Sequence, residues 1–252
     1  MSKKFFKFLC PLVLIFTLSA STVGFKDDQL KYQRVRRAYK EKLEGVKSQL
    51  KKHDLAIGEI KIYLRAFKEE KLIELWVTDN STTKYKLVET FSICKNSGEP
   101  GPKRKRGDLQ VPEGFYHINR FNPVSSYHLS LGINYPNKSD KILGVKGKLG
   151  GDIFIHGECV TIGCLPITNT YIKELYVYCV EAKDNGQTTI PVSIFPAKLD
   201  DNKFISLKEK HSSSKDKIGL WEDLKKGYDY FNKNKELPSI GFLKSGRHTV
   251  SK

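Results

Sequence analysis

The sequence predicts an α+β fold: a mixed, mostly β domain with peripheral helices, preceded by an N-terminal helical arm. Two observations support this prediction. Apolar residues recur at helical spacing early in the chain, alternate at period two through its middle, and return to helical spacing near its end. The 252 residues are 39% hydrophobic and 11% aromatic, a composition typical of a folded chain with a sizeable core.

The start of the chain has the layout of a secretory signal peptide. Three lysines within the first seven residues precede the apolar run 8–18, and small residues follow at 19–22. The run is short for a membrane span, although an uncleaved N-terminal anchor is the alternative interpretation. We therefore assign residues 1–24 to a signal peptide and expect an exported protein of the periplasm or cell envelope.

Residues 25–56 are expected to form the helical arm, because apolar side chains recur there in steps of three to five. Alternation then predicts a β-rich domain over 57–200, with the first strand half-buried. The expected strands are 60–65, 72–77, 85–94, 111–118, 128–133, 152–156 and 189–195.

Two further helices are predicted from apolar stripes. One begins at a cap provided by Thr168 or Asn169 and runs to about residue 182. The other covers 220 to about 234 within a C-terminal extension, 201–252, and the polar tail after Pro238 is expected to be loose.

The chain is strongly basic, with 44 Lys and Arg against 28 Asp and Glu and a formal net charge of +16. No nucleic-acid-binding motif accompanies this charge, so nucleic acid is not expected as a partner. A solvated lysine-rich surface is the simplest interpretation. For an exported protein, association with an anionic membrane surface or envelope polymer is the other interpretation, and the basic run 103–106 fits it.

Five cysteines are present, and Cys10 falls in the signal segment. A disulfide from Cys159 to Cys94, Cys164 or Cys179 is one hypothesis, because an exported chain can keep disulfides. A metal site made by His156, Cys159 and Cys164 is another, although it lacks the second close pair of structural zinc sites. Buried structural cysteines and a catalytic cysteine remain as further alternatives.

The segment 155–164 favours the catalytic alternative. Cys164 follows His156 by eight residues, and an imidazole near a thiol can take its proton and make the nucleophilic thiolate. Gly157 and Gly163 suit sharp turns or close approach of a substrate. The amides of Gly163 and Cys164 are candidates for stabilising an oxyanion.

These residues resemble the active-site motif of the YkuD-type L,D-transpeptidases, in which a histidine precedes a Ser/Thr-x-Gly-Cys run. The chain is most similar to the YafK-type murein L,D-transpeptidase-like branch. The resemblance covers roughly residues 58 to 240 in the same order. It lies in Gly101-Pro102-Lys103, Gly107-Asp108, Pro112-Glu113-Gly114-Phe115-Tyr116, Tyr135-Pro136-Asn137-Lys138-Ser139-Asp140, His156-Gly157-Glu158-Cys159, Ile162-Gly163-Cys164 and Gly227-Tyr228-Asp229-Tyr230-Phe231.

The resemblance implies the residue roles and the reaction. Cys164 would be the nucleophile and His156 its general base, with the Gly157 carbonyl orienting the imidazole as a third triad member. Gly163 and Thr161 would form the loop beside the nucleophile. The thiolate would attack the carbonyl between a diamino acid and the terminal D-alanine of a peptidoglycan stem peptide, and an amine or water would resolve the thioester.

The sequence also departs from the family pattern. Many family members carry a histidine just before Gly-Cys and an arginine just after it, where this chain has Ile162 and Leu165. The acceptor is therefore open: cross-linking, trimming, or release of a wall-attached lipoprotein. We expect no metal and no organic cofactor. The candidates for the substrate groove are Lys103, Tyr127, Tyr135 and Asn137.

Two alternatives from other classes remain. One is a non-catalytic protein that binds the envelope or peptidoglycan on the same fold. The other is a zinc-binding structural module. The intact His156 and Cys164 pair argues against the first, since a protein that only binds has no need of either side chain.

Overall fold

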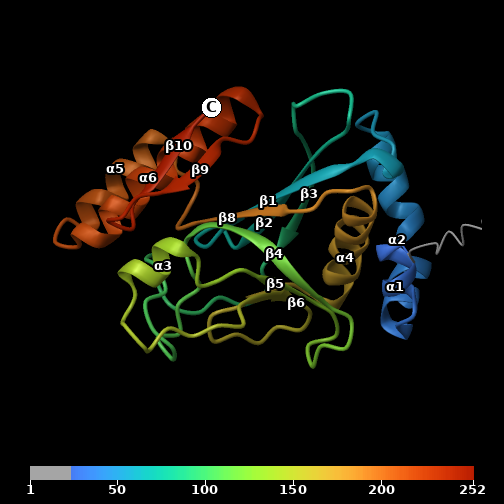
Figure 1. Ribbon diagram of the computed structural model, residues 1–252, viewed down its shortest axis with the longest axis horizontal. Coiled ribbons are helices and arrows are strands. Elements are labelled where there is room, and N and C mark those ends of the chain that lie inside the picture. The colour runs from blue at the N-terminus through green and yellow to red at the C-terminus, as the bar shows by residue number, and fades with distance from the viewer. Residues whose placement is uncertain (1–23) are drawn as a thin grey trace, which may run out of the picture.

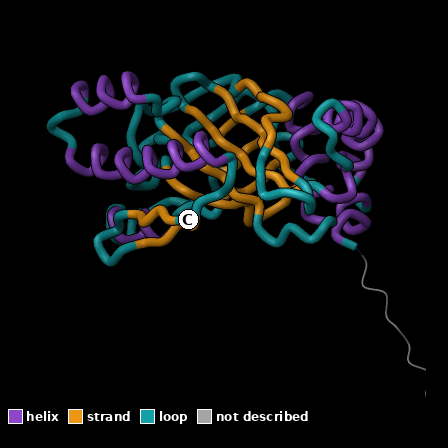
Figure 2. Tube along the Cα trace, turned by 90° about the horizontal axis from the view of Figure 1, so that it is seen from above, coloured by secondary structure: helices purple, strands orange, loops and turns teal. Residues whose placement is uncertain are grey.

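The computed structural model describes residues 24–252, so the signal assigned to residues 1–24 lies outside the described residues except for Gly24. Helices flank the strands on two sides (Figure 2). The predicted α+β class, with a mostly β centre and peripheral helices, is confirmed. Between Gly24 and the C-terminus, no helix is both long enough and apolar enough to span a bilayer.

One large sheet forms the centre of the molecule. Its strands are β1 Lys61–Phe67, β2 Leu72–Thr78, β3 Lys86–Ser92, β4 Gly114–Asn122, β5 Ser130–Ile133, β6 Phe154–His156, β7 Leu165–Pro166 and β8 Ile190–Phe195. Their order across the eight-stranded sheet is β3-β2-β1-β8-β4-β5-β6-β7 (Figure 1). Neighbours are antiparallel except for two parallel pairs, β1 with β8 and β6 with β7.

Three helices pack beside the sheet at the N-terminal side of the molecule (Figure 1). The predicted arm is divided into α1 Phe25–Leu30 and α2 Gln33–Lys51, and both contact α4, Asn169–Asp184. A 3₁₀ turn, η1 Ile57–Glu59, leads into β1. Of the two caps considered for α4, Thr168 is the N-cap, since its Oγ1 accepts a hydrogen bond from the Tyr171 amide.

The opposite side of the sheet is covered by helices from the C-terminal extension, α5 Asp201–Lys210 and α6 Lys215–Asn234. Phe67 and Phe195 of the sheet share one core cluster with Trp221 of α6. This second layer corrects the expected half-buried first strand: β1 is buried along both faces, and Arg65 is only 2% exposed. Its guanidinium lies over the rings of Tyr228 and Phe231, which compensates its removal from water.

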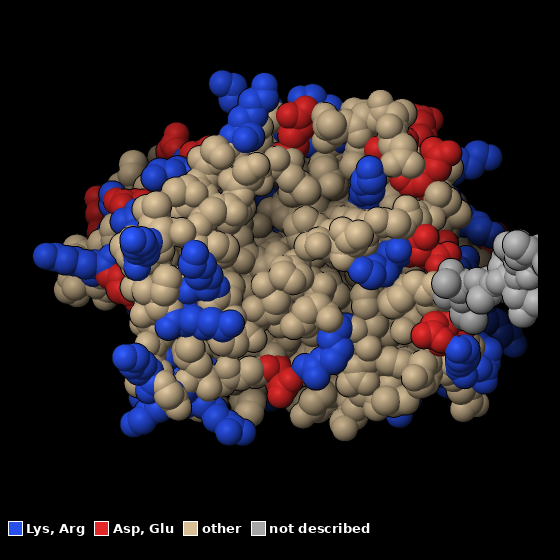
Figure 3. Space-filling model, in the orientation of Figure 1, with Lys and Arg blue, Asp and Glu red and all other residues tan. Residues whose placement is uncertain are grey.

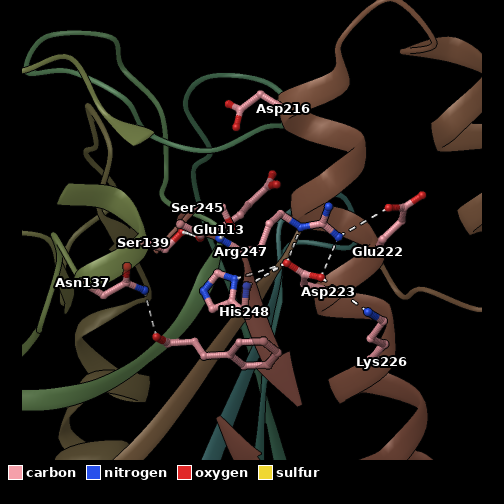
Figure 4. Close-up of polar contacts among 12 residues, drawn as sticks. Glu113, Asn137, Ser139, Asp216, Glu222, Asp223, Lys226, Ser245, Arg247 and His248 are labelled. Carbon is pink, nitrogen blue, oxygen red and sulfur yellow. Dashed lines mark hydrogen bonds and ion pairs between the residues drawn. The ribbon is translucent and has the colours of Figure 1, made fainter. Parts of the chain in front are cut away.

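The prediction of a loose tail after Pro238 is wrong. The strands β9 Ser239–Phe242 and β10 His248–Ser251 form an antiparallel hairpin beside α6. Asp223 of α6 fixes the hairpin by accepting hydrogen bonds from the Arg247 guanidinium and the His248 amide (Figure 4). Arg247 and the His248 amide therefore attach the second strand of the hairpin to α6.

His248 is a buried histidine at this attachment point. Its ring lies between Phe115 and Phe242, at centroid distances of 5.4 and 5.1 Å. Burial lowers the pKa of His248 to about 4, although the neighbouring Asp223 carboxylate acts in the opposite direction. The imidazole is therefore neutral at neutral pH and serves as part of the apolar packing.

Candidate active site

His156 is the last residue of β6. This strand lies between β5 and the edge strand β7. Nδ1 of His156 lies 2.5 Å from the carbonyl oxygen of Gly157. Because a carbonyl can only accept, the proton belongs on Nδ1 and the Nε2 lone pair is left available. The side chain is 1% exposed. This geometry gives His156 the tautomer that a general base requires.

The surroundings of His156 keep the imidazole neutral. Burial lowers its pKa, while the Gly157 carbonyl and the charge of Glu158 oppose that change. Tyr127 covers the ring, with the two ring centroids 4.6 Å apart and an angle of 32° between the planes. Tyr127 is itself 43% exposed, so it shields the imidazole from solvent at the surface of the protein.

Cys164 immediately precedes β7, which pairs in parallel with β6. The register places Ile155 opposite Leu165 and His156 opposite Pro166. From the spacing of adjacent strands and the rise along them, the Cα atoms of His156 and Cys164 are about 8 Å apart. The chain therefore returns beside β6 in parallel with it.

The Cys164 side chain is a partly exposed free thiol, and its Sγ lies 3.8 Å from the Asp152 carbonyl oxygen. Burial raises the pKa of this thiol, while a hydrogen bond from the Phe154 backbone and the positive charge of Lys103 act in the opposite direction. The net effect is a thiol that is protonated at neutral pH. It needs a base to become a nucleophile.

The loop between His156 and Cys164 is held at several points. The Glu158 amide donates to Asn169 Oδ1 at 3.0 Å, which ties the loop to the start of α4. Thr161 Oγ1 accepts from the Gly163 amide at 3.0 Å and donates to the Cys164 carbonyl at 2.8 Å. Thr161 therefore stabilises the turn directly before Cys164.

Both predicted glycines stand where a side chain would clash. A Cβ on Gly157 would lie 2.3 Å from Asn169 Oδ1, and one on Gly163 would lie 2.9 Å from the Gln110 carbonyl oxygen. Gly163 also has φ +139°, which disfavours other residues. Its amide donates to Thr161 Oγ1, so of the two amides considered for the oxyanion, that of Cys164 is the one that Thr161 does not engage.

The disulfide pairing left open by the sequence is Cys94–Cys159, with a Cα–Cα distance of 5.6 Å. Cys94 follows β3, and a bridge between Ile93 and Ile167 brings that segment beside the end of β7. The bond removes Cys159 from the metal set considered with His156 and Cys164. Among residues 24–252, no group of three or more His, Cys, Asp or Glu side chains is arranged to hold a metal ion.

Replacing Cys94 and Cys159 together by alanine is expected to lower the free energy of unfolding by about 2–4 kcal/mol, because the bond closes a loop across a sequence separation of 65. Urea titrations with and without reductant test this. The reductant should lower the unfolding midpoint of the wild type and leave that of the double variant unchanged. A wild type insensitive to the reductant, once alkylation confirms that the cysteines are reduced, would contradict a stabilising disulfide.

A pocket of about 340 Å³ opens beside Cys164. Its walls combine the Cys164 turn, the glycine-rich segment 149–153 and cationic side chains from the loop 103–107. Lys103 is buried there, and its Nζ donates to Asp108 Oδ1 at 2.6 Å and to the Lys105 carbonyl at 3.1 Å. Asp108 also accepts from the amides of Arg104 and Lys105, so it fixes the shape of this loop.

A buried ion pair holds this loop to the rest of the protein. Lys68 Nζ lies 2.8 Å from Glu113 Oε1, and both side chains are almost fully buried. Glu113 also accepts from the Gly101 amide at 2.6 Å and from Trp221 Nε1 at 2.7 Å. Lys68 completes its hydrogen bonds with the carbonyls of Glu99, Gly101 and Val111. The C-terminal helix α6 is thus connected to the wall of the pocket.

The four residues predicted for the substrate groove are placed differently from one another. Lys103 lines the pocket, and Tyr127 lies over His156. Tyr135 is buried, and its hydroxyl donates to the Lys103 carbonyl. Asn137 caps the short helix α3, Lys138–Leu143, through a capping box with Asp140. Tyr135 and Asn137 therefore support the loops and do not line the pocket.

The comparisons with known proteins define the class. Residues 62–194 match the YkuD family, described as the L,D-transpeptidase catalytic domain, and the chain belongs to this family. It is 38% identical over 193 residues to the protein named "Putative L,D-transpeptidase YafK" of Escherichia coli K12, covering 76% of this chain and 74% of that one. The same-named protein of Escherichia coli O157:H7 matches to the same extent. The resemblance recognised in the sequence is confirmed.

Solved structures give weaker similarities. The helical cell shape determining protein Pgp2 of Campylobacter jejuni aligns over 74% of each chain, with 20% identity and a TM-score of 0.44. Bd1075 of Bdellovibrio bacteriovorus aligns over 70% of this chain and 64% of its own, with 18% identity and a TM-score of 0.39.

Proposed function

We propose that this protein is an exported, periplasmic or envelope-located, cysteine-dependent enzyme that forms a thioester between Cys164 and peptidoglycan stem peptides. Its family links the chain to L,D-transpeptidase-type activity on peptidoglycan. The observation that supports the mechanism is that β6, which ends at His156 with Nδ1 held by the Gly157 carbonyl, pairs with β7, which directly follows the free thiol of Cys164 at a pocket. This is the arrangement that nucleophilic cysteine catalysis needs.

We assign each step of the proposed reaction to a named group. His156 Nε2 takes the Cys164 proton, and the thiolate attacks the carbonyl that joins the diamino acid to the terminal D-alanine. The Cys164 amide stabilises the oxyanion as the carbon–sulfur bond forms. The carbon–nitrogen bond then breaks, His156 returns the proton to the leaving amine, and D-alanine departs from the thioester.

The second half of the reaction sets the biological outcome. An amine from another stem peptide gives a cross-link, an amine from a lipoprotein lysine gives attachment, and water gives trimming. Release of a lipoprotein differs in the first half: the Cys164 thiolate attacks the amide that joins the lipoprotein lysine to the stem peptide, the lysine amine leaves, and water then cleaves the thioester. The exposed Arg106 in the pocket wall suits peptides that carry carboxylates, whereas the charge of Lys103 is already paired with Asp108.

The test is a mass-spectrometric assay of stem-peptide muropeptides, with and without lipoprotein-linked material, on wild type and Cys164→Ala. Product formation is expected to fall by about 10³-fold or more in the variant, because no other group can form the thioester. The mass of the wild-type product identifies the reaction: loss of D-alanine, a new cross-link, or freed lipoprotein.

Cys179→Ala is the matched control, since Cys179 is the other free cysteine of the described residues and is buried in the core. It should retain activity. Activity that survives Cys164→Ala would refute the thioester mechanism. A folded wild type that binds muropeptides but yields no product would favour the non-catalytic envelope-binding alternative.

A further inference from the structure

A cationic surface lies beside the pocket, and of its residues only Arg106 also lines the pocket. We call this surface the cationic rim, and it is made by Lys105, Arg106, Lys138, Lys141, Lys146 and Lys148. Two backbone hydrogen bonds join its segments: the Arg106 amide donates to the Lys148 carbonyl at 2.8 Å, and the Val145 amide donates to the Arg104 carbonyl at 2.9 Å. Figure 3 shows Lys and Arg gathered at the lower left, in the region of α3 in Figure 1.

The charges of the rim are not neutralised by the protein. All six side chains belong to exposed residues, and none makes an ion pair with any residue from 24 to 252. The nearby acids are already engaged: Asp108 with Lys103, Asp152 with Arg120, and Asp216 with Arg104. Asp140, within the rim segment, is buried and accepts from the Tyr116 hydroxyl. The rim therefore presents an uncompensated positive field.

Apolar side chains project among these cations. Ile142 and Val145 are each 42% exposed, and Leu143 is 37% exposed. Exposed apolar residues are common singly, but these three lie within four consecutive residues. Exposed aliphatic side chains surrounded by lysines are typical of a protein surface that binds an anionic bilayer. The lysines contact headgroups, and the aliphatic groups enter the acyl boundary.

From this combination we propose that the cationic rim docks the protein onto an anionic phospholipid surface. The apolar residues distinguish this partner from a soluble polyanion, which offers no acyl region for Ile142 and Val145. Because Arg106 belongs both to the rim and to the pocket wall, docking brings the pocket beside the lipid headgroups. The proposal concerns binding alone and does not depend on the proposed catalysis.

Vesicle co-sedimentation tests the proposal, with vesicles of phosphatidylcholine alone or mixed with phosphatidylglycerol. The protein used starts at Gly24, because the apolar run 8–18 would enter vesicles by itself. This part contains the eight-stranded sheet and the core clusters on both sides of it, so it can fold on its own. Binding should require phosphatidylglycerol and should weaken as salt is raised.

The decisive variant is Lys141→Gln/Lys146→Gln/Lys148→Gln, which should weaken vesicle binding about a hundredfold, at about fivefold for each lysine. The matched control, Lys40→Gln/Lys51→Gln/Lys52→Gln, removes the same charge at α2 and its C-cap and should bind like the wild type. Equal losses in both variants would overturn the proposal, because overall charge alone would then explain binding. So would wild-type binding by the rim variant, or no binding of the wild type.

Ile142→Ser/Val145→Ser separates the two anionic partners without changing charge. It should weaken vesicle binding several-fold and leave binding to soluble polyphosphate unchanged. Vesicle binding unaffected by this variant, together with equally tight polyphosphate binding, would assign the rim to a soluble polyanion and overturn the membrane proposal. Unfolding midpoints matching the wild type verify that the variants are folded.

Discussion

Replacing His156 by glutamine is expected to lower kcat/KM of the wall-peptide reaction by about 10²–10⁴-fold, which is the contribution of a positioned general base. Glutamine retains a polar side chain of comparable reach but cannot take a proton from Cys164. The loss should lie in kcat more than in KM, because the imidazole acts on the thiol and His156 is absent from the walls of the pocket.

The pH dependence gives this prediction a second readout. In the wild type His156 is the neutral base, and burial keeps its pKa below the ordinary value of 6.5, so activity should persist on the acid side of neutrality. In His156→Gln, reaction must await spontaneous ionisation of Cys164, whose pKa is raised by burial. The rate should therefore climb about tenfold per pH unit into the alkaline range.

Measuring kcat/KM across pH for both proteins distinguishes a base from a structural residue. A variant that keeps the wild-type pH profile at reduced amplitude would show that His156 only supports the fold. Urea unfolding of the variant provides the control for stability. Alkylation of Cys164 over the same pH range should reproduce the difference without any substrate.

Replacing Glu113 by glutamine is expected to lower the free energy of unfolding by about 3–5 kcal/mol. The change removes the negative charge that neutralises Lys68, and the ammonium group cannot reach water. The backbone carbonyls around Lys68 Nζ remain, but they carry no full charge. The side chain at position 113 also becomes a weaker hydrogen-bond acceptor for Trp221 Nε1 and for the Gly101 amide.

A double variant separates the ion pair from the packing around it. Lys68→Met/Glu113→Leu removes both charges while keeping most of the volume, so it should be less destabilised than Glu113→Gln alone. Urea titrations of the three proteins measure this. A loss below about 1 kcal/mol in Glu113→Gln would show that water or a rearranged partner reaches Lys68.

Much of the fold follows from local patterns in the chain. Near-alternating apolar residues mark β1, an apolar-rich run marks β2, and the stripe beginning after Thr168 marks α4, because such patterns of apolar residues are typical of buried strands and helices. Short helices are harder to predict from such patterns. The helix α3 was missed even though Asn137 and Asp140 form its capping box, since six residues are too few for a periodic pattern. The helix α5 was missed because only Leu207 of its ten residues is buried.

The candidate site divides in the same way. The motif can be recognised from the sequence because its residues lie within nine consecutive positions: His156, Gly157, Thr161, Gly163 and Cys164. Their catalytic roles remain predictions. The loop that lines the pocket, by contrast, is held in place by residues far away in sequence, such as Lys148, although Asp108 shapes it locally.

By itself, the sequence determined the family, the α+β class and the segment that carries the candidate nucleophile and base, because these depend on residue types at short, fixed spacings. Only the tertiary structure decided that Cys159 bonds to Cys94, that β1 is buried on both faces, and that two segments some forty residues apart form the cationic rim. Such features depend on which distant backbones lie side by side. That is set by the summed packing of the whole chain, which no local pattern records.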